Sequence, residues 1–350
     1  MSMSGRYSSR ALPDVRRRID IVQYLRGLAS LAVAWFHLTN SWTDGVRVSG
    51  SFGWLGVDVF FVISGFVIPY SISMTYETYS LKTFVNFISR RFVRIEFPYI
   101  VSIIVVIVLA HFSALSPGFQ GKAADYTTAQ IISNIFYIAS WTGQEWMEPV
   151  YWTLAYEFAF YLTIGLLFSV LFGKRRSLAY WFAVGIFVLA VSRGFMGSLV
   201  LLFVMGSAVF RYIMGRERLV YATGIVIVCT IVTVLAGNLA SAMAGLVAAT
   251  IIGLGRGFQL SGRPGWILTY LGTISYSLYL IHVPVGGRVV NLGRRFVHGE
   301  FGHLIVSGLA LAVALAFAHL FYVFVERPAL RKARQLVDWG LVRAVDEVRC

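Results

Sequence analysis

Apolar runs of roughly twenty residues recur along this sequence, and they limit what it can fold into more than any other feature. A helix needs about 20 consecutive apolar residues to cross the hydrocarbon core of a bilayer. We count ten such runs and predict an all-α, polytopic membrane helix bundle with about ten transmembrane helices, nine and eleven being the alternatives. The predicted spans are about 20–40, 53–74, 97–115, 149–171, 177–192, 195–213, 219–237, 239–255, 266–285 and 303–325.

The scarcity of charged residues supports this membrane location. Only 13% of the residues are charged and 58% are hydrophobic, whereas a soluble domain carries roughly a quarter charged residues. So few charges cannot cover a water-facing surface, and we expect lipid to cover the apolar faces. The net charge of +14 comes mostly from short clusters between the apolar runs, which is typical of membrane topology and not of a nucleic-acid-binding patch. We therefore expect a multi-pass integral membrane protein with no nucleic-acid partner.

The distribution of Lys and Arg predicts the orientation of the helices. With the N-terminus placed in the cytoplasm, the inner segments hold 23 of the 30 Lys and Arg residues and the outer segments hold 6, while Arg26 lies within a span. Cytoplasmic loops are enriched in these residues. Both termini are therefore predicted to be cytoplasmic, which requires an even number of spans.

The chain contains no sign of a separate soluble domain. We predict a basic cytoplasmic N-terminal segment at 1–19, a transmembrane domain at 20–328 and a cytoplasmic C-terminal tail at 329–350. The first apolar run lacks a small-residue cleavage site, so it is interpreted as a retained helix and not as a signal peptide. The two cysteines, Cys229 and Cys350, are too far apart to suggest a disulfide framework or a metal site.

Ionisable residues within the apolar runs are the candidates for chemistry, because they are costly in a bilayer and usually face a bundle interior. Arg26 and His37 are 11 residues apart, which places them on one helix face about 16 Å apart along the axis. Asp58, Glu157 and His282 lie on three other spans, and the topology places them with His37 in the outer half of the membrane. Such a group suits proton transfer to or from a hydroxyl.

Several alternatives to this interpretation remain open. Arg26 can extend toward the interface and His37 can hydrogen-bond a neighbouring carbonyl, with no chemistry involved. The same histidines and carboxylates also suit a proton-coupled transporter of a small polar solute, although no pair of inverted repeats is visible. A non-catalytic scaffold or sensor would leave these groups idle. Motifs for nucleotide, dinucleotide, zinc-protease and serine-elbow chemistry are absent from the sequence.

An ordered set of short segments resembles acyltransferase family 3, membrane enzymes that O-acylate carbohydrates and some antibiotics. The segments are QYLRGLASLAVAWFH, GWLGVDVFFVISGF, FISRRFVRI, VYWTLAYEF, LGTISYSLYLIH and VERP, and together they span roughly residues 20–328. Each is weak alone, but their order is specific. Some relatives also carry a C-terminal extracytoplasmic hydrolase-like domain, and this sequence stops soon after its last predicted span.

The resemblance implies an acyl donor, usually acetyl-CoA, with no bound cofactor or metal, and an acceptor hydroxyl on a carbohydrate or glycosylated small molecule. It also implies a bacterial inner-membrane location, and it leaves the acceptor, the acyl group and the oligomeric state unspecified. The implied catalytic residues are His37, Asp58 and Glu157. The family pattern matches Arg26, Ser64, Gly65, Arg90, Arg91, Arg94 and His282, which together with Tyr156 beside Glu157 form the predicted substrate and donor site.

These residues suggest a route for the reaction. Arg90, Arg91 and Arg94 would bind the donor phosphates, because the planar guanidinium can bind two phosphate oxygens. The alternative is that these arginines only fix the topology. The acyl-bearing arm would pass Arg26 and reach His37, which would act as the general base. Asp58 or Glu157 would orient this histidine, and a covalent acyl-histidine is a further variant.

Overall fold

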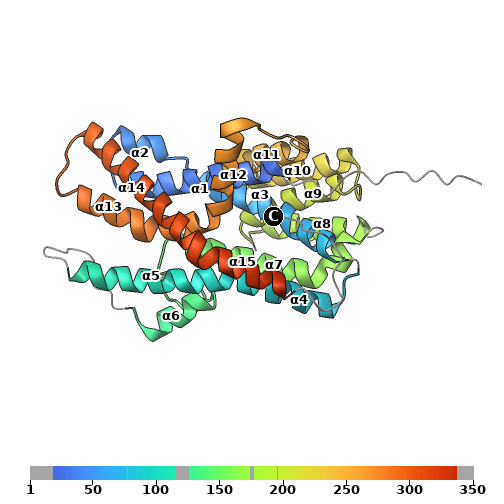
Figure 1. The fold of residues 1–350 in the computed structure, drawn as a ribbon. Helices are drawn as coiled ribbons and strands as arrows, with labels where there is room; N and C mark the ends of the chain where they lie inside the picture. The colour runs from blue at the N-terminus through green and yellow to red at the C-terminus, as the bar shows by residue number, and fades with distance from the viewer. Residues whose placement is uncertain (1–18, 77, 116–125, 174–176, 195, 337–350) are drawn as a thin grey trace, which may run out of the picture.

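The computed structural model describes residues 19–76, 78–115, 126–173, 177–194 and 196–336, and their regular structure is helical (Figure 1). Residues 1–18 of the predicted N-terminal segment and 337–350 of the predicted tail lie outside this part. The α-helices are α1 Asp20–Thr39, α2 Gly45–Gly50, α3 Leu55–Thr75, α4 Leu81–Arg91, α5 Phe97–Ala114, α6 Thr128–Ile135, α7 Tyr151–Phe172, α8 Ser177–Ser192, α9 Leu199–Ile213, α10 Leu219–Leu235, α11 Leu239–Leu254, α12 Gly262–Ile281, α13 Gly287–Gly293, α14 Glu300–Phe321 and α15 Arg327–Gln335. Three π-helical segments join some of them: η1 Phe92–Glu96, η2 His282–Gly286 and η3 Tyr322–Glu326.

The all-helical prediction is confirmed for the described residues, and each of the ten predicted spans overlaps one helix. Five helical stretches in this part are long and apolar enough to cross a bilayer, and four further apolar helices are shorter. The number of membrane crossings and the cytoplasmic location of the termini remain predictions. The five long stretches are Asp20–Thr39, Gly45–Thr75, Leu81–Ala114, Tyr151–Phe172 and Glu300–Gln335.

The π-helical segments were not predicted, and prolines account for them. Pro98, Pro284 and Pro328 lie within or just after η1, η2 and η3. Proline has no backbone N–H, so the carbonyl four residues earlier loses its helical partner and the helix locally widens. The widening does not break the helix, and α14, η3 and α15 form one long continuous helix that runs across the bundle in Figure 1.

Two close helix crossings hold the centre of the bundle together. In the first, α1 packs on α12, and a Cβ added to Gly27 would lie 2.9 Å from the backbone nitrogen of Gly272. In the second, α3 packs on α9, and a Cβ added to Gly65 would lie 2.2 Å from the carbonyl oxygen of Phe203. Small residues let helix backbones approach closely in membranes. Gly65, which was predicted to contact substrate, therefore lies in a helix–helix contact.

Candidate functional site

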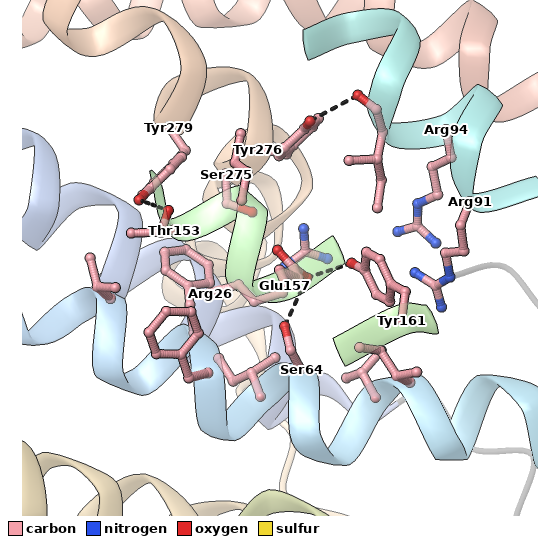
Figure 2. A pocket seen from close by; sticks show the side chains of 18 of the residues that line it. Arg26, Ser64, Arg91, Arg94, Thr153, Glu157, Tyr161, Ser275, Tyr276 and Tyr279 are labelled. Carbon is pink, nitrogen blue, oxygen red and sulfur yellow. Dashed lines mark hydrogen bonds between the residues drawn. The ribbon is translucent and has the colours of Figure 1, made fainter. Parts of the chain in front are cut away.

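A cavity of about 100 Å³ lies among α1, α3, α4, η1, α7, α12 and η3 (Figure 2). Polar side chains from several of these helices face it, and apolar side chains of α3 cover much of the remainder. This arrangement is typical of ligand sites, in which a few polar groups converge within an apolar wall. The polar lining residues are Arg26, Ser64, Arg91, Arg94, Thr153, Glu157, Tyr161, Ser275, Tyr276, Tyr279 and Glu326.

Glu157 lies at the centre of the cavity lining, as Figure 2 shows. One carboxylate oxygen accepts hydrogen bonds from Ser64 Oγ, at 2.9 Å, and from the Tyr161 hydroxyl. The Arg26 guanidinium is close enough to attract the same carboxylate electrostatically. A charge removed from water needs such partners, so Ser64, Tyr161 and Arg26 hold Glu157 in a fixed position within the cavity.

Two of the three predicted phosphate-binding arginines face the cavity, and one does not. Arg91 and Arg94 are three residues apart and lie side by side in Figure 2. The Arg91 guanidinium also lies 5.2 Å from the centre of the Tyr161 ring. Arg90 instead donates from Nε to the carbonyl of Ala333 on α15, at 3.2 Å. Adjacent helical residues point about 100° apart, so Arg90 and Arg91 cannot share one face.

Glu326 is a site residue that the reasoning from sequence missed. It lies at the end of η3, is 5% exposed, and lines the cavity. Ser277 Oγ on α12 donates a 2.5 Å hydrogen bond to its carboxylate. A single acidic residue at the end of the last apolar run, within the segment VERP, was the available signal.

His37 and His282 lie close together, although they come from different ends of the chain. Their ring centroids are 5.3 Å apart. His282 is fully buried, and its Nδ1 lies 3.0 Å from the carbonyl oxygen of Leu278. A nitrogen facing a carbonyl must carry the proton, so Nε2 of a neutral His282 holds a free lone pair. That Nε2 is buried and has no partner among the described residues.

Three side chains of the cavity lining link it through direct contacts to His282, and we call them the partition: Phe60, Thr153 and Tyr279. All three line the cavity. The Tyr279 hydroxyl and Thr153 Oγ1 are 2.6 Å apart, the Phe60 ring packs edge-on against Tyr279, and the Tyr279 ring centroid is 6.0 Å from that of His282. Tyr279 therefore both lines the cavity and contacts His282.

Asp58 and Tyr156 lie outside the cavity lining. Asp58 on α3 is 1% exposed, and its carboxyl group lies near the Ser241 side chain of α11. No hydrogen bond joins Asp58 to His37 in the described part, because α3 turns this face toward α11. Tyr156 is exposed on α7 and packs against Phe61. Catalytic or binding roles for Asp58 and Tyr156 remain predictions.

Comparisons with known proteins agree with the resemblance. The chain is 30% identical to the peptidoglycan O-acetyltransferase OatA of Listeria monocytogenes over 141 residues, which is 40% of this chain and 20% of the relative. It is 28% identical to the O-acetyltransferase OatA of Staphylococcus aureus over 181 residues, which is 49% of this chain and 27% of the relative. The matches therefore span only about a quarter of the length of these relatives. No solved structure matches the chain significantly.

The family comparison covers far more of the chain than either relative does. A family model described as an acyltransferase domain matches residues 19–323 of the 350. The matched region contains the cavity lining except Glu326, together with the partition and both histidines. The chain therefore belongs to acyltransferase family 3.

Proposed function

We propose that this protein is a membrane O-acetyltransferase that transfers an acyl group, usually acetyl, from acyl-CoA to a hydroxyl of a carbohydrate-type acceptor. Family membership and the names of two relatives support the acyl-transfer chemistry. The carbohydrate acceptor is inferred from the peptidoglycan named for the Listeria relative. The observation that carries the proposal is the cavity containing Arg26, Arg91 and Arg94, whose lining residue Tyr279 packs against His282 of the histidine pair.

The proposed chemistry is general-base catalysis by His37. His37 accepts the proton of the acceptor hydroxyl while the hydroxyl oxygen attacks the thioester carbon. The new C–O bond forms, the C–S bond breaks, and the CoA thiolate leaves and takes up the proton. The free Nε2 lone pair of His282 is available to accept a hydrogen bond from the His37 ring and orient it.

We assign the two substrates to different sides of the partition. The arginine-containing cavity lies beside α4 and α15, which the topology places near the cytoplasm, where acyl-CoA is made. His37 lies in the outer part of α1, so the acceptor would enter from the outer face of a bacterial inner membrane. The partition would then open so that the thioester can meet the acceptor.

The experiment is a coupled measurement of CoA release and ester formation. Purified protein in lipid nanodiscs receives acetyl-CoA and peptidoglycan-derived oligosaccharides, and mass spectrometry follows the acetylated product. We expect both products in equal amounts, and we expect His37→Ala to lower turnover roughly 10²- to 10⁴-fold. Unchanged turnover in His37→Ala would remove this residue from the mechanism. Solute flux without any CoA release would favour the proton-coupled transporter.

A further inference from the structure

A second cavity of about 320 Å³ adjoins the first and contains an unusual concentration of arginine. Five arginines and one carboxylate line it, from α1, η1, η3 and α15. Arg26 and Arg94 are half-buried at its inner end, whereas the α15 arginines are exposed at its mouth. We call this cavity the vestibule. Its lining residues are Gln23, Arg26, Arg94, Gly272, Thr273, Tyr322, Glu326, Arg327, Leu330, Arg331 and Arg334.

The arginines of α15 form one stripe that the fold holds in place. Arg327, Arg331 and Arg334 are four and three residues apart, which puts them on the same helix face. The opposite side of α15 is fixed to α4, because Arg90 donates to the Ala333 carbonyl and Asn86 Nδ2 donates to the Leu336 carbonyl at 2.8 Å. Arg90 therefore fixes the helix that carries the stripe, and the stripe itself faces the vestibule.

The lining of the vestibule carries more positive than negative charge. Glu326 is its single acidic lining residue, and that carboxylate already accepts a hydrogen bond from Ser277. Among the residues that the structure describes, Arg26, Arg94 and Arg327 donate no hydrogen bond to a protein group. Several guanidinium groups held together repel one another, and multivalent phosphate relieves this repulsion through paired N–H donors. The vestibule therefore fits a ligand with several phosphate groups.

The vestibule and the inner cavity share Arg26, Arg94 and Glu326. The two cavities therefore adjoin at these three side chains, and a ligand that occupied both would pass between them. Its phosphates would lie in the vestibule, and its thin arm would pass between these three residues toward Glu157 and the partition. The 3′-phosphate and diphosphate of CoA together carry about four negative charges at neutral pH, which matches five arginines and one carboxylate.

We propose that the vestibule binds the adenosine 3′-phosphate 5′-diphosphate portion of the acyl-CoA donor, with Arg327, Arg331 and Arg334 of α15 as phosphate ligands. This proposal rests on the function proposed above and revises its donor site. The sequence predicted phosphate contacts with Arg90, Arg91 and Arg94. The present proposal replaces Arg90 and Arg91 with the α15 stripe and keeps Arg94.

The test compares vestibule variants with a neighbouring control on the same helix. The double variant R327Q/R331Q removes two stripe arginines, whereas Lys332→Gln removes an exposed charge of α15 that lies outside the vestibule lining. We expect R327Q/R331Q to raise KM for acetyl-CoA at least about tenfold with little change in kcat, and K332Q to leave both unchanged. Equal KM values for R327Q/R331Q and the wild type would overturn the proposal.

A second donor locates the phosphates. Acetyl-dephospho-CoA lacks the 3′-phosphate, so the wild type should show a raised KM for it. In R327Q/R331Q the KM values for the two donors should differ much less. The reason is that the variant lacks the guanidinium groups with which the 3′-phosphate would interact. The same fold difference between donors in the wild type and in R327Q/R331Q would assign the 3′-phosphate elsewhere and overturn the proposal.

Direct binding separates this proposal from the proposed function. Adenosine 3′,5′-bisphosphate is titrated calorimetrically into the protein in phosphatidylcholine nanodiscs, and R327Q/R331Q should weaken its binding at least about tenfold. Normal turnover of the wild type with unchanged binding in this variant would overturn the vestibule assignment alone. Absence of CoA release from the wild type with any acceptor would overturn the proposed function. Phosphatidylglycerol nanodiscs test whether lipid headgroups supply the phosphate that the vestibule binds. If the wild type no longer binds adenosine 3′,5′-bisphosphate in these nanodiscs, the vestibule would be assigned to lipid headgroups and the donor assignment would be overturned.

Discussion

The imidazole rings of His37 and His282 lie with their centroids 5.3 Å apart and their planes at 48°. The Leu278 carbonyl fixes which nitrogen of His282 carries the proton, and His282 Nε2 is left without a partner. The pair therefore offers one half-exposed imidazole and one fully buried imidazole with a defined tautomer.

Replacing His282 should impair the chemical step more than donor binding. We expect His282→Gln to lower kcat roughly 10- to 100-fold with little change in KM for acetyl-CoA, because the residue orients His37 and does not contact the donor phosphates. The pH profile of kcat should shift as well, since the surroundings of His37 change. His111→Gln, on the exposed part of α5, is the matched control. A rise in KM with constant kcat would place His282 in donor binding.

The hydrogen bond between Tyr279 and Thr153 should keep the thioester away from water until an acceptor is present. Tyr279→Phe and Thr153→Val each remove this 2.6 Å contact and loosen the partition. Each variant should therefore release CoA faster than the wild type when no acceptor is added. The two changes remove one interaction, so the double variant should release CoA no faster than either single variant. Additive effects, or no release in any variant, would contradict a gating role for the partition.

Glu148 provides a pH-dependent contribution to stability outside the predicted spans. Burial raises the pKa of Glu148 to about 7, and nearby Arg288 partly opposes this rise. An acid whose pKa is higher in the folded state stabilises the fold while protonated and loses that stabilisation as the pH rises. The Tm should therefore fall as the pH rises from about 4.5 through about 7, and it should level off once Glu148 is ionised in both states. Glu148→Gln should reduce this dependence in thermal unfolding at a series of pH values, and an unchanged slope would exclude Glu148 as its source.

The helical architecture could be predicted because apolar length and basic clusters act locally along the chain. Each predicted span overlaps a helix for this reason. The vestibule could not be predicted, because it depends on the angle at which α15 leaves η3 and meets α4. The sequence placed Arg327 and Arg331 only in or near a cytoplasmic tail. Nothing in it indicated that this segment lies beside Arg26 and Arg94.

The residue-level predictions divide in the same way. Arg26, Arg91 and Glu157 line one cavity, and His37 meets His282 beside it, because helix periodicity places such residues on inward faces. The position of Asp58 near Ser241 depends instead on how α3 rotates against α11. The sequence of α3 alone does not predict that rotation. The partition was also missed, since Thr153 and Tyr279 become partners only after two distant helices pack.

Gly65 can be tested as a packing residue against its predicted role in substrate binding. A Cβ at this position would lie 2.2 Å from the Phe203 carbonyl oxygen, so Gly65→Ala must push α3 and α9 apart. We expect a loss of about 1–3 kcal/mol, because added volume in a close-packed interface forces the backbone to move. Gly224→Ala on α10 is the control, since a Cβ there meets no atom within 4 Å. Thermal unfolding in detergent should show a lower Tm for Gly65→Ala and an unchanged or higher Tm for Gly224→Ala. An unchanged Tm for Gly65→Ala with a raised KM for either substrate would instead assign Gly65 to binding.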